Sequence, residues 1–438
     1  MKRFFQTIKN IFSIEDLRVR ILNTMGFLII FRLGSFIVLP GIDPAALTGA
    51  PQEGILALLN TFLGGSFSRA SIFALGIMPY ISASIIVQLL TVAVPYFQKM
   101  QKEGDSGRKR LNQITRVLTI LITGFQSYGY IRGTIPAEAI IDPGFFFYFS
   151  AIAILIGGTM FCMWLGERIT DKGIGNGISM LIMIGIVSRF PGSIIDEAVN
   201  NRGLSGGIIF VIELLALFAV VMGVILITQA TRRIPIQYAK QVVGNKLYGG
   251  KRDFIPLKLN SAGVMPIIFA QALMFIPALI GGIWRDSEAG AYIGSTFSDF
   301  TSWQYNVVFG SLILLFTFFY TAITINSNDI ADNLKRNGGF VPGVKPGKQT
   351  SEFIDTVLSR ITLPGAIFLV IIAVMPAFAV IAGVGQNFAQ FFGGTSLLIL
   401  VGVVLDTLQQ IESYLLMRHY EGMMKSGRVK GRSQFAAA

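Results

Sequence analysis

Long apolar runs constrain this chain more than any other feature of its sequence. Ten candidate membrane spans follow one another, at residues 21–39, 76–97, 117–131, 145–164, 177–190, 206–230, 263–284, 306–325, 361–382 and 395–417. A helix needs roughly 20 apolar residues to cross the hydrocarbon core of a bilayer. Since 53% of the 438 residues are hydrophobic and only 14% are charged, we expect an all-α polytopic membrane protein.

Basic residues indicate how the spans are oriented. Of the 36 Lys and Arg residues, all lie in the termini or in the loops at 98–116, 167–176, 231–259 and 327–360, except Arg32, Arg69, Arg132, Arg189, Arg202 and Arg285. An excess of Lys and Arg marks the cytoplasmic side of a membrane protein. Both termini are therefore predicted to be cytoplasmic, which agrees with an even number of spans.

Two pairs of short motifs divide the spans into halves. Gly76-Ile-Met-Pro-Tyr-Ile81 matches Gly263-Val-Met-Pro-Ile-Ile268, each with a Gly that permits a turn and a Pro suited to a first helical turn. Gly177-Ile-Ser-Met-Leu-Ile182 likewise matches Gly394-Thr-Ser-Leu-Leu-Ile399. Motifs this short can coincide by chance. Two ordered matches nevertheless predict two inverted five-helix halves, at 21–190 and 191–417, flanked by an amphipathic segment at 1–20 and a tail at 418–438.

Isoleucines occupy the equivalent positions of these motifs. An inverted repeat places its working site at the midplane between the halves. The isoleucines expected to converge there are Ile77, Ile81, Ile85, Ile182, Ile268 and Ile399. A ring of branched apolar side chains would exclude ions, because an ion would have to lose its water there. Ordinary core packing is the alternative explanation of the same spacing.

Residues 54–73 suit neither a span nor a lipid-facing loop. Apolar residues in this stretch are interrupted by Gly64-Gly65 and then by Ser66, Ser68 and Arg69. Irregular backbone at membrane depth must lie against protein or line a cavity. We expect a short re-entrant half-helix that enters from the outer side, with a plain extracytoplasmic loop as the alternative.

Side chains that could act in catalysis, proton coupling or metal binding are scarce. The ionisable groups within the spans are Arg32, Glu213, Asp406 and Glu412, and a single cysteine and a single histidine leave no metal cluster. The chain is therefore expected to be no enzyme and to hold no metal or cofactor. An ion-coupled secondary transporter of small solutes is the alternative to a channel, but it should show a midplane carboxylate and a polar pocket. A membrane docking scaffold without a pore is a third class.

Two cytoplasmic loops are longer and more basic than a topology signal requires. Their basic residues are Arg232, Arg233, Lys240, Lys246, Lys251 and Arg252 in the loop at 231–259, and Lys335, Arg336, Lys345 and Lys348 in the loop at 327–360. Such loops suit a partner with an acidic or phosphate-rich face. Contact with lipid headgroups is the alternative.

Taken together, these residues closely resemble the SecY family, which forms the pore of the bacterial Sec protein-conducting channel. The resemblance covers nearly the whole chain and is most specific at Arg32-Leu-Gly-Ser-Phe-Ile37, Ser68-Arg-Ala-Ser-Ile-Phe-Ala-Leu-Gly-Ile-Met-Pro79, Trp164-Leu-Gly-Glu167, Gly173-Ile-Gly-Asn-Gly-Ile-Ser179, Ala331-Asp-Asn-Leu-Lys335 and Phe392-Gly-Gly-Thr-Ser-Leu-Leu398. The chain departs from the family at Lys345, where an arginine is usual. Lysine keeps the charge but loses the bidentate fork.

The resemblance implies an hourglass pore whose constriction contains Ile77, Ile81, Ile182, Ile268 and Ile399. It implies a plug that closes the pore from outside, formed by Leu58, Leu59, Asn60, Thr61, Phe62, Leu63, Gly64, Gly65, Ser66, Phe67, Ser68 and Arg69. It also implies a lateral gate of spans two and three against spans seven and eight, held shut by Gln88, Gln126 and Asn260.

The activity implied is translocation of unfolded secretory polypeptides across the cytoplasmic (inner) membrane of a bacterium, and lateral insertion of membrane segments into lipid. The implied partners are the small membrane subunits SecE and SecG, the SecA ATPase motor, the ribosome, and preproteins with their signal peptides. The basic loops correspond to the docking surface for SecA and ribosomes, and Arg232 and Arg233 match the family's basic pair.

Overall fold

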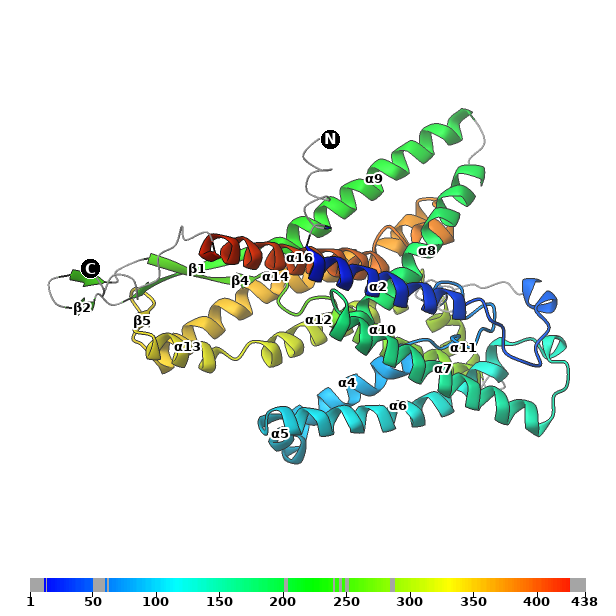
Figure 1. Ribbon diagram of the computed structural model, residues 1–438. Coiled ribbons are helices and arrows are strands. Elements are labelled where there is room, and N and C mark those ends of the chain that lie inside the picture. Colours follow the sequence, from blue (N-terminus) through cyan, green and yellow to red (C-terminus); the bar gives the residue numbers. More distant parts are fainter. Residues whose placement is uncertain are drawn as a thin grey trace. The chain divides into compact units, whose positions relative to one another are not determined.

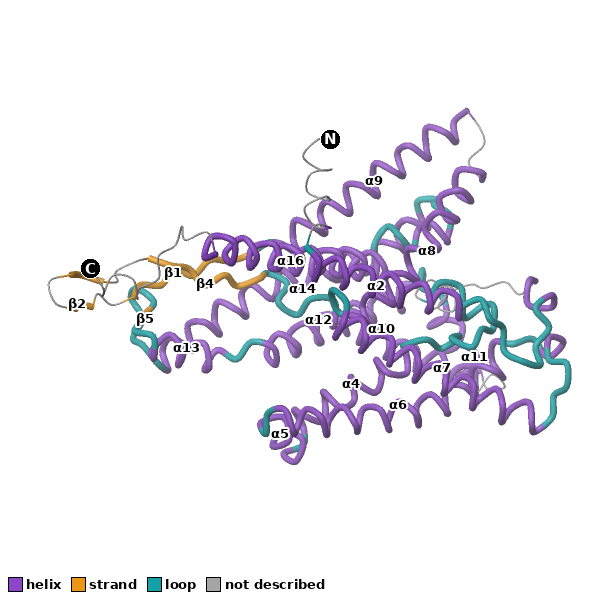
Figure 2. The backbone as a smooth tube through the Cα atoms, viewed as in Figure 1, coloured by secondary structure: helices purple, strands orange, loops and turns teal. Residues whose placement is uncertain are grey.

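The computed structural model describes residues 12, 14–49, 60, 63–200, 204–238, 241–243, 246–248, 252–283 and 288–425 (Figure 1, Figure 2). The chain divides into two compact units. Unit 1 consists of Met1–Gln52, Leu59–Arg189 and Gly402–Ala438, and unit 2 consists of Glu53–Leu58 and Phe190–Val401.

Unit 1 is built from helices. They are α2 (Glu15–Gly34), α4 (Met78–Ala93), α5 (Pro95–Lys102), α6 (Asp105–Thr134), α7 (Phe145–Lys172), the first part of α8 (Gly177–Asn200) and the last part of α16 (Gly394–Lys425), with the 3-10 turns η1 (Ala45–Gly49) and η2 (Ala137–Ala139). Isolated β-bridges join Val38 to Ser71 and Ile42 to Ile140. These bridges tie together the connections at one end of the helices.

Unit 2 contains helices and strands. Its helices are the rest of α8 and α16, α9 (Leu204–Gln229), α10 (Met265–Ile283), α11 (Glu288–Ser298), α12 (Trp303–Thr324), α13 (Ser327–Arg336), α14 (Lys348–Ile381) and α15 (Gln386–Ala389). Its strands are β1 (Thr231–Tyr238), β2 (Gln241–Val243), β3 (Lys246–Tyr248), β4 (Arg252–Lys258) and β5 (Gly339–Phe340). They form a sheet of order β4-β1-β5 and a separate β2-β3 pair.

The same helix pairing occurs in both units. In unit 1, α6 packs against α4 and α7, and in unit 2, α12 packs against α10 and α14. Both central helices carry buried threonines four residues apart, which are Thr115, Thr119 and Thr123 on α6 and Thr317 and Thr321 on α12. Each hydroxyl donates to the carbonyl four residues earlier, at 2.6–2.9 Å. These buried hydroxyls are therefore satisfied within their own helices.

The repeated motifs start helices, as expected. Gly76 and Gly263 have φ values of 52° and 64°, which glycine adopts without steric cost. The proline three residues after each glycine lies in the first turn of α4 or α10, where its missing amide hydrogen breaks no helical bond. The second pair of motifs starts α8 at Gly177 and α16 at Gly394. The sequence repeat and the helix boundaries therefore agree.

The expected span at 76–97 is wrong at its end. α4 stops at Ala93, and the chain bends by 99° into α5. Pro95 causes this break, because it lacks an amide hydrogen and disfavours the helical region for the residue before it. Val94 accordingly has the extended values φ −113° and ψ 119°.

The expectation from sequence missed the small sheet in unit 2. Ile234 and Ile236 are buried on β1 between exposed residues, and they join a hydrophobic cluster that includes Leu257 of β4. This alternation has the period of a strand, although residues 231–259 were expected from the sequence only to form a basic loop. Pro235 is tolerated because only β4 pairs with β1 at this residue. β5 pairs with β1 only at residues 237 and 238, so β1 is an edge strand at Pro235.

Several helices have the length and composition of membrane spans. Among the described residues, α7, α8, α9, α12, α14 and α16 qualify, and α4 with α5 would make a seventh. α9 is the most apolar of them, and only 17% of its most apolar window is buried, as expected for a helix that faces lipid. The expected helices α2, α6 and α10 are present but do not meet the same criterion, so the count of ten spans stays a prediction.

Candidate functional site

The candidate pore isoleucines are divided between the units, with Ile77, Ile81, Ile85 and Ile182 in unit 1 and Ile268 and Ile399 in unit 2. The first three recur every fourth residue and are buried, with Ile77 as the N-cap of α4 and the other two within its first turns. Ile182 and Ile399 are also buried, and Ile268 is half-buried. Burial suits either a ring or ordinary packing, so the convergence of the six side chains stays a prediction.

The structure describes the expected plug at Asn60 and from Leu63 onward, while Leu58, Leu59, Thr61 and Phe62 lie outside the described residues. Residues 63–73 are named here the plug segment. Residues 63–70 form a run of turns, so the expected half-helix is wrong for this part. Gly64, Gly65 and Ala70 have positive φ values of 62°, 86° and 46°, which interrupt a right-handed helix.

The plug segment contacts two helices that carry candidate pore isoleucines. A Cβ on Gly76, the residue before Ile77, would lie 2.4 Å from Leu63 Cδ2. A Cβ on Gly64 would lie 3.0 Å from the Cα of Gly185, three residues after Ile182 in α8. The start of the plug segment therefore packs against residues that are adjacent to Ile77 and about one turn from Ile182.

Two side chains donate hydrogen bonds to backbone carbonyls of the plug segment. Arg32 Nη1 of α2 donates to the Gly64 carbonyl at 3.1 Å. The Tyr130 hydroxyl of α6 donates to the Phe67 carbonyl at 2.6 Å, and the two rings pack with centroids 4.7 Å apart. These bonds satisfy backbone groups that the irregular turns leave without helical partners. Sequence reasoning missed the role of Tyr130, because nothing in the order of residues connects α6 to the plug segment.

The far end of the plug segment is fixed between α2 and α7. Phe73 stacks on Phe31 of α2 and on Phe161 of α7, with centroid distances of 5.9 and 5.8 Å. A Cβ on Gly158 of α7 would lie 2.1 Å from the Ile72 carbonyl oxygen, so a larger residue cannot occupy this position without a backbone shift. Aromatic stacking and this close approach make the end of the segment a rigid anchor.

The three polar residues expected at the lateral gate lie in different parts of the structure. Gln88 on α4 and Gln126 on α6 are half-buried in unit 1, where the two helices pack together. Asn260 belongs to unit 2 and lies in the turn before α10, outside the helix. Its Oδ1 is buried and has no hydrogen-bond partner in the described part of the chain. An interaction among the three side chains stays a prediction.

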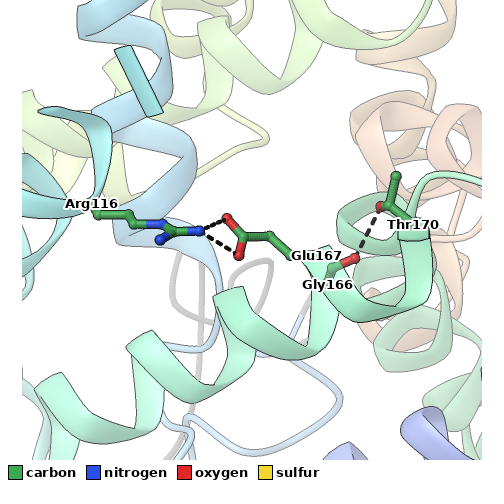
Figure 3. Close-up of polar contacts among 4 residues, drawn as sticks. All are labelled: Arg116, Gly166, Glu167 and Thr170. Carbon is green, nitrogen blue, oxygen red and sulfur yellow. Dashed lines mark hydrogen bonds and ion pairs between the residues drawn. The ribbon is translucent and has the colours of Figure 1, made fainter. Parts of the chain in front are cut away.

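An ion pair between α6 and α7 was not expected from sequence. Arg116 Nη2 donates to both carboxylate oxygens of Glu167, at 2.9 and 2.8 Å (Figure 3). The side chains are 46% and 33% exposed, so the pair contributes at most about 1 kcal/mol. One turn further, the Thr170 hydroxyl donates to the Gly166 carbonyl and accepts a bond from the Gly177 amide, at 3.0 and 2.9 Å. α7 is thus linked to both α6 and α8.

The two basic loops of unit 2 fold together into one small subdomain. The sheet, α13 and the start of α14 share a hydrophobic cluster of Ile234, Ile236, Leu257, Leu334, Val341, Ile354 and Leu358. The exposed basic residues on this subdomain include Arg232, Arg233, Lys258, Lys335, Arg336, Lys345 and Lys348. Lys246 and Arg252 are on β3 and β4, and Lys240 and Lys251 lie outside the described residues. We call this subdomain the basic platform.

A small cavity lies in unit 2, between α10, α12, α14 and the start of α16. Its volume is about 30 Å³, and its polar lining includes Gln271, Asn306, Gln390 and Thr395. This is room for one or two water molecules, whereas small-molecule sites measure about 300–1,000 Å³. Among the described residues there is also no group of three His, Cys, Asp or Glu side chains that could hold a metal ion. This cavity is too small to hold a small-molecule solute.

Known proteins are similar to this chain over nearly its whole length. Residues 71–408 match the model of the SecY family. The protein translocase subunit SecY of Escherichia coli K12 is 43% identical over 440 residues, covering 98% of each chain. That of Corynebacterium glutamicum is 40% identical over 441 residues, covering 94% of this chain and 98% of the relative. A solved protein-conducting channel aligns with a TM-score of 0.67 at 16% identity, covering 90% of this chain and 92% of that one.

Proposed function

The chain belongs to the SecY family, and from this membership we propose that it forms a protein-conducting channel of the cytoplasmic membrane. Unfolded secretory polypeptides pass through it, and apolar segments leave it sideways into lipid. The observation that supports the proposal is the position of the plug segment, which packs against Gly76, the residue before Ile77, and against Gly185, about one turn after Ile182 in α8. A segment placed there can obstruct a passage lined by these isoleucines.

The six isoleucines are proposed to close around the translocating chain. Isoleucine is stiff at χ1 and apolar, so a ring of these residues fits tightly around an extended chain and offers ions no substitute for water. The plug segment blocks the passage when no polypeptide is present. The channel supplies no energy of its own in this scheme, and the driving force comes from a motor ATPase or from chain elongation.

Resting conductance in planar bilayers tests the ring. We expect the double variant Ile81→Gly and Ile268→Gly to conduct ions in the absence of substrate, because the constriction loses two branched side chains. Ile86→Gly is the matched control, since Ile86 lies on α4 next to the ring face but is 40% exposed. Unchanged resting conductance of the double variant would contradict the ring, whereas increased conductance of the control alone would indicate a general loss of helix packing.

The lateral gate is proposed to lie between α4 with α6 and α10 with α12. A segment that reaches this gate partitions into lipid according to the transfer free energy of its residues. Gln88, Gln126 and Asn260 are proposed to hold the gate shut, since polar groups in an apolar setting favour one another over lipid. Crosslinks from a stalled secretory chain to Gln88 would support this path and would exclude a scaffold without a pore.

The basic platform is proposed to dock cytoplasmic partners. A solved relative, the canine Sec61 channel bound to a ribosome, aligns with a TM-score of 0.63 at 16% identity, covering 90% of this chain. We propose that Arg232 and Arg233 contact ribosomes and the SecA motor, and that SecE and SecG accompany the chain in the membrane with both termini cytoplasmic. Co-sedimentation with ribosomes should weaken in the variant Arg232→Glu with Arg233→Glu, and equal binding would contradict this assignment.

A further inference from the structure

Two buried polar side chains that line the small cavity of unit 2 lack a hydrogen-bond partner in the described part of the chain. The atoms concerned are the hydroxyl of Tyr305 on α12 and Nε2 of Gln271 on α10. The two residues are only 2% and 5% exposed. A buried polar atom without a partner destabilises a protein, and such atoms in native structures normally have one.

Neighbouring polar side chains of the same cavity already have partners. Asn306 Nδ2 donates to two backbone carbonyls that precede it in the chain, each at 2.9 Å. The Ser396 hydroxyl donates to the Gln390 carbonyl at 2.5 Å. Among the described residues that line the cavity, the buried atoms without a partner therefore belong to Tyr305 and Gln271, which come from two different helices.

The size and the lining of the cavity suit water. Its volume of about 30 Å³ leaves room for one or two molecules. A buried water needs two to four polar partners, and the side chains of Tyr305, Gln271 and Thr395 surround the same space. No charged residue is among those that line the cavity in the described chain, so an ion would lose its hydration there without a counter-charge.

We propose that this cavity holds structural water that bridges the Tyr305 hydroxyl and Nε2 of Gln271. The water accepts a hydrogen bond from the Gln271 amide and donates one to the tyrosine oxygen, so both buried groups gain a partner. Such a bridge joins α10 to α12, two helices that pack against each other. This hydration site goes beyond translocation itself, because it belongs to the resting protein and needs no substrate.

The bridge lies close to the pore isoleucines expected in unit 2. Gln271 follows Ile268 by three residues on α10, and Ser396 precedes Ile399 by three residues on α16. Three residues correspond to about 4.5 Å along a helix. The water therefore joins the helix that carries Ile268 to its neighbour within about one turn of that isoleucine.

Removing one partner at a time tests the bridge through the sign of the change in stability. If water gives each group its partner, Tyr305→Phe and Gln271→Met should each lower the midpoint of thermal unfolding of the solubilised complex, by about 1–3 °C. The double variant should lose less than the sum of the two, because the second change removes a bridge that is already broken. In a dry cavity both atoms are unpaired, so each variant would raise the midpoint, and such a rise would overturn the proposal.

Tyr320→Phe is the matched control, because it removes a tyrosine hydroxyl from the same helix outside the cavity. Tyr320 is half-buried and packs on Phe269 of α10, with ring centroids 5.7 Å apart. We expect its midpoint of unfolding to stay unchanged. A decrease as large as that of Tyr305→Phe would show that any tyrosine hydroxyl between α10 and α12 has this effect, which would contradict the bridge.

Radiolytic labelling detects the water directly. X-ray pulses generate hydroxyl radicals from water, and a radical formed inside a closed cavity reacts with the side chain beside it. In the resting complex we expect Tyr305 to be hydroxylated several-fold faster than Tyr130, which is also buried but whose hydroxyl bonds directly to the Phe67 carbonyl. Gln271→Met should lower the rate at Tyr305. Equal rates at the two tyrosines would overturn the water site, even if Tyr305→Phe and Gln271→Met were coupled in thermal unfolding, because a direct bond between the two side chains would then explain the coupling.

Discussion

The connection before α4 and the connection before α10 occupy the same place in the two halves of the chain, yet they differ in almost every property. The first, residues 35–77, contains the buried and irregular plug segment. The second, residues 230–264, contains the β1–β4 hairpin with exposed arginines. Both end in the Gly-x-Met-Pro motif that starts a helix. The comparison shows that the two halves keep the helix start and vary what precedes it.

A second shared feature was found only in the structure. Gly158 on α7 approaches the Ile72 carbonyl, and Gly365 on α14 approaches the Leu259 carbonyl. Each carbonyl lies four residues before the glycine of its Gly-x-Met-Pro motif. A helix of each unit therefore touches the backbone of its connection at the corresponding point. This close approach fixes the end of each connection, independently of the other residues in that connection.

The largest effect is expected in unit 1. The added methyl group of Gly158→Ala would lie 2.1 Å from the Ile72 oxygen, so we expect a loss of about 2–3 kcal/mol, the upper part of the range for overpacking. Gly157→Ala is the matched control, because a Cβ there meets nothing within 4 Å. The midpoint of thermal unfolding of the solubilised complex measures both. Equal midpoints for the two variants would show that the close approach does not matter.

The corresponding change in unit 2 should be milder. In Gly365→Ala the added methyl group would lie 2.7 Å from the Leu259 oxygen, so a smaller backbone shift relieves the contact. We expect a loss of about 1–2 kcal/mol. Gly223→Ala on α9 is the control, since nothing lies within 4 Å of its Cβ. If Gly365→Ala proved more harmful than Gly158→Ala in thermal unfolding, the two contacts could not be regarded as equivalent.

Tyr130→Phe removes the hydroxyl that holds the plug segment to α6. The Phe67 carbonyl then loses a bond of 2.6 Å, and we expect the seated state to lose about 1 kcal/mol, or roughly a factor of five in the population of the displaced plug. Resting conductance in planar bilayers should rise accordingly. Tyr128→Phe on the exposed side of the same helix should leave conductance unchanged. A rise in both variants would indicate that α6 as a whole had been loosened.

The smallest effect is expected at the ion pair of unit 1. Arg116→Lys keeps the charge but not the two parallel bonds to Glu167, and the pair is partly exposed. We expect a loss below about 0.5 kcal/mol. Arg110→Lys, an exposed arginine on the same helix, serves as reference. A loss in thermal unfolding as large as that of Tyr130→Phe would mean that α6 and α7 depend on this pair far more than its exposure indicates.

Much of the fold followed from the sequence because hydrophobic length and turn residues act locally. The apolar runs located the helices, and the glycines at 76 and 263 marked real changes of backbone direction. The end of α4 was misjudged, since Pro95 was treated as part of a span although it cannot continue one. The sheet was missed because residues 231–259 were interpreted only as a basic loop, although Ile234 and Ile236 alternate with the period of a strand.

The candidate site was harder to predict, because its contacts join residues far apart in the chain. The plug segment was located by its glycines, and the resemblance assigned Arg69 to it, whereas Arg32 was recognised only as a charge within a span. The bonds from Arg32 to Gly64 and from Tyr130 to Phe67 depend on how α2 and α6 lie in unit 1. No local pattern encodes such a distance. The convergence of the isoleucines depends on the placement of one unit against the other and stays a prediction.

The threonines buried along α6 have a mechanical consequence. Because Thr115, Thr119 and Thr123 direct their hydroxyls to their own backbone, this face of the helix makes no side-chain hydrogen bond to a neighbour through them. A neighbour that moves along this face disturbs dispersion contacts there, and these contacts re-form at each new offset. The polar bonds that tie α6 to other elements are made by other residues, Arg116 and Tyr130, so the threonine face is the part of the helix that adapts at the smallest cost.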